Sequence, residues 1–261
     1  MAKYVNQGAH AIFAVTDFVE LSMLNPSPIS AQDNEYLLGK TLADAAAAIP
    51  TLRHYIWSTL PSAKTISGGR YNVFHFQGKA AVDEYIIQNL PALAEKTTFL
   101  WVGYYANTFA YPPLVPKMDS TTGKHVWRLP VSPDTLVSSI GSPADNVGVF
   151  AAAILSQQAL TLPAKYVLAA AEKTTQGGML KKWSNIMEYE TEYIEVLIEE
   201  FERLFPGWEV FIEMFQFWEE FGEKSWSKEG ITPIEGSDLG INNSQLIDIE
   251  GTVKKMKCAS E

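Results

Sequence analysis

The chain of 261 residues contains a single cysteine, Cys258, close to its C-terminus. A lone cysteine can form no internal disulfide, so the sequence predicts a reducing compartment. No apolar run approaches the length of a membrane helix, and the N-terminal apolar stretch around His10 lacks a signal-peptide cleavage pattern. We therefore expect a cytoplasmic protein with no membrane partner.

Several catalytic and binding motifs are also missing. The four histidines lie far apart, without cysteine or carboxylate partners at ligand spacing, which predicts no metal site. There is no Gly-x-Ser-x-Gly elbow and no phosphate-binding P-loop. No Gly-x-x-Gly-x-x-Gly occurs, and the pairs Gly68-Gly69 and Gly177-Gly178 have the wrong spacing for one. The sequence thus gives no loop of the kind that holds a dinucleotide pyrophosphate.

The charge of the chain is acidic and concentrated in one segment. The formal net charge is −10, and residues 183–235 hold fourteen Asp or Glu against three Lys or Arg, a net of −11. Phosphate backbones repel such a chain, so we expect no direct binding to nucleic acid. The acidic segment is interpreted either as a docking surface for a basic partner or as the solvated face of two amphipathic helices, and the second is favoured.

Strand-like runs alternate with helical ones from the start of the chain. Apolar residues make up 47% of the sequence, enough for a sizeable core with a smaller lobe. Strands are predicted at residues 9–16 and 54–59, and a third strand is predicted to end near residue 103. Helices are predicted over 35–49 and around Lys79, and a loop is predicted over 18–34. This order predicts an α/β fold with a parallel sheet and helices on both faces. Further on we expect a helix at 145–155, a return to the sheet at 165–171, and helices at 190–205 and 208–221.

Five separated segments in this order resemble the NmrA-like family of atypical short-chain dehydrogenases, related to isoflavone reductase. They are Gly8 to Thr16, Gly39 to Ala46, His54 to Ser58, His75 to Lys79 and Tyr105 to Phe109. The resemblance is good over residues 8–110 and loose over 111–225. It implies a Rossmann-like sheet that here lacks the glycine-rich N-terminal unit, followed by an α-rich substrate lobe. We expect a partial Rossmann-like domain over 1–115, the substrate-side lobe over 116–240 and a loosely ordered tail over 241–261.

The lacking unit has consequences for the cofactor and for assembly. The resemblance implies NADP or NAD as cofactor, but no backbone cradle for the pyrophosphate is present in the sequence. The strand at 9–16 is expected to expose an apolar edge, which would promote a homodimer. The sequence is compatible with a truncated gene product or with a family member that has abandoned the usual way of holding the cofactor.

Lys79 is the first candidate for chemistry. In ordinary short-chain dehydrogenases a tyrosine lies four residues before such a lysine, which binds the nicotinamide ribose; here that position is His75. His75 is interpreted as a proton relay or as a structural residue, and the second is favoured. Tyr105 is the other candidate acid. Lys79 is expected to reach the surface, so that Lys79→Ala abolishes turnover and leaves folding nearly intact.

The resemblance assigns further residues to the cofactor cleft. Thr16, Asp17 and Ser58 follow strands whose carboxyl ends would face the cofactor, and Tyr104 and Asn107 would lie at the nicotinamide end. A carboxylate at Asp17 is unfavourable beside pyrophosphate. The aromatic stripe that includes Trp208, Phe211, Phe215 and Trp218 is interpreted as a substrate pocket or, more often for such spacing, as core.

Three functions fit these residues. The first is an NAD(P)H-linked oxidoreductase of a small, aromatic metabolite, with a role in secondary metabolism. The second, which the resemblance also implies, is a redox-sensing partner of a transcriptional regulator, active in the cytoplasm or the nucleus. The third is a cofactor-independent isomerase or cyclase that reuses the cleft.

Overall fold

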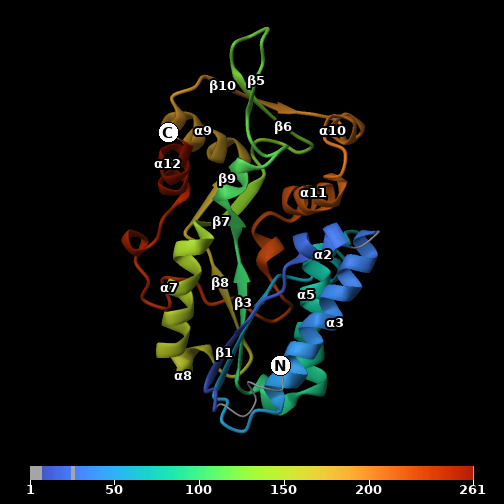
Figure 1. Ribbon diagram of the computed structural model, residues 1–261, viewed down its shortest axis with the longest axis vertical. Coiled ribbons are helices and arrows are strands. Elements are labelled where there is room, and N and C mark those ends of the chain that lie inside the picture. The colour runs from blue at the N-terminus through green and yellow to red at the C-terminus, as the bar shows by residue number, and fades with distance from the viewer. Residues whose placement is uncertain (1–7, 25–26, 261) are drawn as a thin grey trace. The chain divides into compact units, whose positions relative to one another are not determined.

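The computed structural model describes residues 8–24 and 27–260, which belong to two compact units (Figure 1). Unit 1 comprises Met1–Val102, Phe150–Ala169 and Trp226–Gly240, and unit 2 comprises Gly103–Val149, Ala170–Ser225 and Ile241–Glu261. The domain boundaries expected from the sequence, 1–115, 116–240 and 241–261, stay a prediction. The two units interleave because the chain returns twice to the first one after leaving it.

Unit 1 is built on a parallel sheet of four strands in the order β1-β2-β3-β8. These strands are β1 (Ala11–Ala14), β2 (His54–Thr59), β3 (Thr97–Val102) and β8 (Lys165–Ala169). The predicted α/β class and the return to the sheet near residue 165 are confirmed. Every residue of β3 is buried, as expected for a central strand covered on both faces.

The helices of unit 1 flank this sheet (Figure 1). They are α2 (Phe18–Leu24), α3 (Pro28–Ala47), α4 (Ala63–Ile66), α5 (Phe74–Asn89), α6 (Pro91–Ala94) and α8 (Gln158–Thr161), while α7 (Pro143–Ser156) has residues in both units. The predicted loop over 18–34 is wrong, since most of it is helical. Ser27 caps α3 by accepting a hydrogen bond from the Ser30 amide, with Pro28 in the first turn, so α3 begins seven residues earlier than expected.

Helices α3 and α5 approach each other closely. A Cβ added to Gly39 of α3 would lie 2.7 Å from Val82 of α5, and one added to Gly78 of α5 would lie 2.9 Å from Glu35 of α3. The buried face of α3 therefore consists of small residues around Glu35, whereas Leu38 is 42% exposed. This contact places Glu35 beside Lys79.

Unit 2 contains two small three-stranded sheets. The first sheet has the order β10-β6-β5, with β10 (Thr191–Glu195), β6 (His125–Leu129) and β5 (Lys117–Met118). The second sheet has the order β4-β7-β9, with β4 (Tyr104–Tyr105), β7 (Leu136–Gly141) and β9 (Glu172–Thr175). The predicted helix over 190–205 is wrong in its first half, because β10 occupies it. Only α10 (Ile198–Leu204) remains helical.

Three further helices complete unit 2: α9 (Gln176–Met187), α11 (Ile212–Phe221) and α12 (Ile249–Ser260). Short 3-10 turns cover Ala106–Ala110, Glu209–Phe211, Gly222–Trp226, which crosses into unit 1, and Asn243–Gln245. The expectation of a loosely ordered tail is corrected: α12 lies against α9, and its Ile249 and Val253 are fully buried. Among the described helices, none is long and apolar enough to cross a membrane.

Candidate functional site

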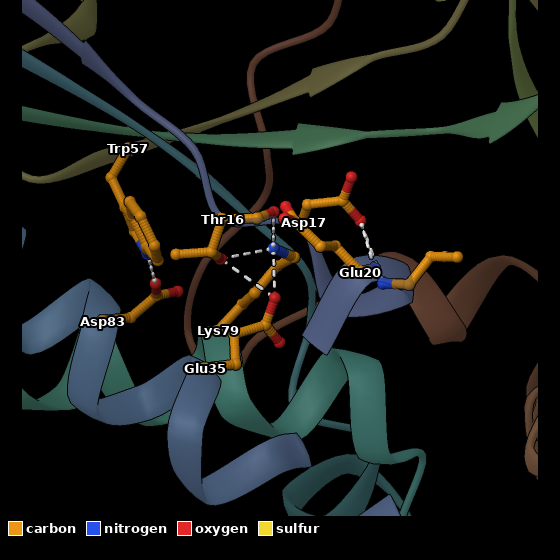
Figure 2. Close-up of polar contacts among 8 residues, drawn as sticks. Thr16, Asp17, Glu20, Glu35, Trp57, Lys79 and Asp83 are labelled. Atoms are coloured by element: carbon orange, nitrogen blue, oxygen red, sulfur yellow. Dashed lines mark hydrogen bonds and ion pairs between the residues drawn. The ribbon is translucent and has the colours of Figure 1, made fainter. Parts of the chain in front are cut away.

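Lys79 lies in unit 1 at the centre of a buried hydrogen-bond cluster (Figure 2). Its Nζ donates to Glu35 Oε1 at 2.6 Å, to Thr16 Oγ1 at 2.7 Å and to the Thr16 carbonyl at 2.8 Å. Thr16 Oγ1 in turn donates to Glu35 Oε1 at 2.9 Å. An ammonium group has three donors, and all three have protein acceptors here. Lys79 is only 8% exposed, so the expectation of a surface-reaching lysine is wrong.

Glu35 completes this cluster, although no motif in the sequence points to it. Its side chain is fully buried, and burial raises its pKa although the adjacent Lys79 ammonium opposes the change. Glu35 Oε2 has no hydrogen-bond partner among the described residues. A buried carboxylate of this kind depends on its one cation for stability.

Asp17, predicted to lie beside the cofactor, instead caps α2. Its Oδ1 accepts hydrogen bonds from the amides of Val19 at 2.9 Å and Glu20 at 3.2 Å. These are the first amides of the helix after β1, and the carboxylate supplies the acceptor that they require. The start of α2 is therefore occupied by a negative charge from the chain itself.

His75 lies one turn before Lys79 on α5, packed near Phe18 and Phe76 with ring centroids 5.6 and 4.9 Å away. Burial, with a smaller contribution from the charge of Lys79, lowers the pKa of His75 to about 3. The ring is thus neutral at physiological pH, which argues against a cationic acid and favours the structural interpretation.

A second buried polar group lies one turn beyond Lys79, at Asp83 of α5. The Trp57 indole Nε1 donates to Asp83 Oδ1 at 2.9 Å, and Asp83 is only 3% exposed (Figure 2). Burial raises its pKa to about 8, against the opposing charge of Lys228. Lys228 Nζ donates to the Tyr166 hydroxyl at 3.0 Å and pairs with Glu84. The only sequence signal for Asp83 is its position one helical turn after Lys79, and that spacing does not point to Trp57 or Lys228.

The remaining predicted residue of unit 1 is Ser58, near the end of β2. It is partly buried, and its neighbour Thr59 is 1% exposed. The described part of unit 1 also has a hollow of about 250 Å³ at the amino ends of its strands, lined by residues that include Ile49, Leu52, Leu93 and Lys96. None of the predicted site residues lines this hollow.

Tyr104, Tyr105 and Asn107 belong to unit 2. Tyr104 packs edge-on against Trp218 at 5.4 Å, and burial raises the pKa of its phenol. Neither Tyr104 Oη nor Asn107 Oδ1 has a hydrogen-bond partner among the described residues, although both atoms are buried. Tyr105 is 43% exposed and is the accessible phenol of the pair.

The aromatic stripe predicted as a substrate pocket divides into two parts. Phe215 and Trp218 of α11 are buried, and Phe215 exposes no surface to a ligand. Trp208 and Phe211 are partly exposed, with ring centroids 5.3 Å apart. Burial of Phe215 favours the core interpretation for the inner part of the stripe. In the described part of the chain, no group of three or more metal-ligating side chains occurs.

The sequence pattern of the NmrA-like family matches residues 2–253, almost the whole chain. The chain belongs to the NmrA-like family. The nitrogen metabolite repression protein nmrA of Emericella nidulans is 32% identical over 130 residues, which are 49% of this chain and 32% of that protein. The chain thus aligns with about a third of the length of this curated relative.

Solved structures agree on the fold. Two structures of the negative transcriptional regulator NmrA, one in complex with NAD and one in complex with NADP, are similar to this chain. Their TM-scores are 0.70 and 0.69, each at 20% sequence identity, and each match covers 100% of this chain and 79% of the NmrA chain. Pinoresinol-lariciresinol and phenylcoumaran benzylic ether reductases give a TM-score of 0.59 at 12% identity, covering 93% of this chain and 80% of theirs. These relatives confirm the Rossmann-type α/β fold.

The residues of unit 1 do not fit a dinucleotide at the carboxyl end of β1. Phosphate groups bind to free amides at a helix start and to cations. Here the Asp17 carboxylate occupies the first amides of α2, and Glu35 and Thr16 take all three donors of Lys79. A phosphate at this place would meet a carboxylate and no available cation among these residues.

Proposed function

We propose that this chain acts as a regulatory protein that works through contact with another protein, and that it is not an oxidoreductase. The observation that carries the proposal is the engagement of Lys79. The lysine that would hold the nicotinamide ribose is 8% exposed and donates all its hydrogen bonds to Thr16 and Glu35. The relative from Emericella nidulans is a nitrogen metabolite repression protein, which supports the same class of function.

The acidic segment of unit 2 supplies a surface for such contact. Glu199, Glu200 and Glu202 lie on α10, next to exposed Leu197 and Leu204. A surface that combines carboxylates with exposed leucines fits a partner with basic and apolar side chains. We expect the partner to be a component of transcriptional regulation.

Nucleotide binding tests the first half of the proposal. Calorimetry with NADPH and with NADH on residues 1–261 is expected to give no saturable heat at micromolar nucleotide. The missing contacts are charge-assisted hydrogen bonds worth about 1.5–3 kcal/mol each. The NmrA regulator already solved with both nucleotides serves as the positive control. Micromolar affinity for either nucleotide would overturn this part of the proposal.

Substitution of the acidic residues tests the second half. In an Emericella nidulans strain without its own nmrA protein, the chain is expected to restore repression of a nitrogen-regulated reporter gene. Changing Glu199, Glu200 and Glu202 to glutamine should weaken partner binding by about tenfold, because each exposed charge contributes roughly 0.2–1 kcal/mol.

A matched control has the same change in net charge elsewhere. Glu20, Glu95 and Glu229 are exposed in unit 1, and their replacement by glutamine should leave repression as in the wild type. Equal repression by both triple variants would exclude α10 as the contact surface.

An oxidoreductase is the second candidate, and exposed Tyr105 is the observation that favours it. A phenol that is accessible to a small molecule can donate a proton to a substrate bound within hydrogen-bond reach. Tyr105→Phe should abolish turnover of any substrate found for the chain.

A further inference from the structure

Residues 246–258 of unit 2 form one segment, which we call the α12 strap. It begins with three residues outside regular secondary structure, 246–248, and continues into α12. Within unit 2, α12 contacts α9, β7 and the turn Ala106–Ala110 (Figure 1). The four residues before the strap, 242–245, are all exposed. The strap is therefore joined to the preceding chain by a short exposed segment.

The main chain of Ile247, near the start of the strap, is held by Asn146, which is fully buried. Asn146 Nδ2 donates to the Ile247 carbonyl at 2.8 Å, and Asn146 Oδ1 accepts from the Ile247 amide at 2.9 Å. The Ser142 amide donates to the same carbonyl at 3.1 Å. A Cβ at Gly141 would collide with this carbonyl, so glycine permits the close approach. These contacts recognise a main chain and do not depend on the side chain of the residue that is held.

Two aliphatic side chains four residues apart anchor α12. Ile249 and Val253 are both fully buried, and this spacing places them on one face of the helix. Lys257 follows on the same face, where its Nζ donates to the Ile186 carbonyl at 3.0 Å and to Glu188 Oε2 at 3.2 Å. Both of these acceptors lie at the end of α9, where a cation is favoured. The surface under the strap thus accepts aliphatic side chains at one end and a lysine at the other.

The second half of α12 is held by exposed ion pairs. Lys255 pairs with Asp145 at 2.8 Å, and their side chains are 54% and 38% exposed; those of Lys257 and Glu188 are 32% and 80% exposed. Such pairs contribute little to stability and are screened by salt. A helix of twelve residues is also only marginally stable by itself in water. The strap can therefore undock and lose its helix as a unit, which leaves Asn146 and the rim carboxylates open to another segment.

We propose that the surface under the α12 strap is a binding site for a basic amphipathic helix of a partner protein, which displaces the strap. The strap itself defines the chemistry that the site accepts: aliphatic residues at positions i and i+4, and lysines at i+6 and i+8, as in Ile249, Val253, Lys255 and Lys257. Residues 251–258 hold three lysines and no acidic residue, whereas the whole chain carries a net charge of −10. A basic helix from another protein is therefore attracted to the same carboxylates.

This inference goes beyond the proposed function, because the site shares no residue with α10 and its test needs no reporter gene. The probe is a fluorescein-labelled synthetic peptide of unrelated sequence that keeps only the two aliphatic and the two lysine positions. In the full-length variant Lys255→Glu with Lys257→Glu, the strap would oppose the carboxylates of Asp145 and Glu188. Fluorescence anisotropy should show saturable binding of one peptide to each chain of this variant. The wild type should bind about tenfold more weakly, because its strap occupies the site.

A matched control makes the same change in charge away from the strap contacts. Lys64 and Lys254 are exposed, and Lys64→Glu with Lys254→Glu should bind the peptide as weakly as the wild type does. A peptide with glutamates in place of both lysines should not bind to any of these proteins. Equal affinity of the wild type and the strap variant, no binding to either, or equal binding of the glutamate peptide would each overturn the proposal.

The exposed Cys258 gives a second readout in the wild-type chain. It is the only cysteine of the sequence and lies one turn after Lys254, on the outward face of α12. A nitroxide label on Cys258 should be immobilised while the strap is docked. Saturating peptide should make the label mobile, and in the strap variant it should be mobile before peptide is added. If the label stays immobile while the peptide is bound, the peptide binds elsewhere and the proposal is wrong.

Discussion

Replacing Lys79 by methionine is expected to lower the free energy of unfolding by about 3–5 kcal/mol, because Glu35 would then be a buried carboxylate without its cation. Glu35 is 0% exposed, and its contacts with Lys79 and Thr16 are the hydrogen bonds that satisfy its Oε1. Urea unfolding followed by circular dichroism measures the loss. The sequence predicted the opposite, that Lys79→Ala leaves folding nearly intact.

Two control variants distinguish the stability contribution of the buried Lys79–Glu35 pair from the effect of removing any lysine charge. Lys40 pairs with Asp44 one turn away on α3, and their side chains are 34% and 43% exposed. Lys40→Met removes the same charge and should cost less than about 1 kcal/mol. The double variant Glu35→Leu with Lys79→Met should recover most of the lost stability, since it leaves no buried charge. If Lys79→Met is as stable as Lys40→Met, the buried pair does not form in solution.

This result also decides how activity data on Lys79 can be read. Loss of turnover in Lys79→Ala would follow from unfolding as well as from lost chemistry. Activity should therefore be compared in the double variant, where the charge is absent and the fold is retained. Turnover that disappears in a stable double variant would support the oxidoreductase, and turnover that persists would remove Lys79 from the mechanism.

The sequence predicted the elements of unit 1 well where the pattern was local. Alternation of strands and helices gave the parallel sheet, and the spacing around residue 165 gave the last strand of that sheet. The environment of Lys79 could not be predicted in this way. Its partner Glu35 lies 44 residues away on another helix, and the contact depends on the close approach at Gly78.

In unit 2, the periodicity of apolar residues did not predict the secondary structure correctly. Residues 191–195 carry Thr, Tyr and Ile, which favour a strand, but their glutamates continue the helical pattern of α10. The polar C-terminal segment was expected to be loosely ordered because it lacks a long apolar pattern. Ile249 and Val253 lie four residues apart on one face of α12 and are both buried, and α12 packs against α9.

The pH dependence of stability is expected to differ between the wild type and Asp83→Asn. Burial raises the pKa of Asp83 to about 8 in the folded protein, from an ordinary value of 3.8. Between these values the unfolded chain releases a proton that the folded protein keeps, so wild-type stability falls as pH rises. From pH 5 to pH 8 the wild type should lose about 4 kcal/mol relative to the variant. Near pH 4 the two proteins should be similar, since the amide keeps the size of the protonated carboxyl.

Urea unfolding at a series of pH values from 4 to 9 measures this difference. Other buried groups, such as Glu35 and His54, are the same in both proteins, so their contributions cancel in the comparison. Exposed Glu95 in the same unit provides the control, and Glu95→Gln should follow the wild-type curve. Parallel curves for the wild type and Asp83→Asn would show that Asp83 is ionised in the folded protein at neutral pH. In that case the Trp57 indole and the Lys228 ammonium would stabilise the charged carboxylate more than burial destabilises it.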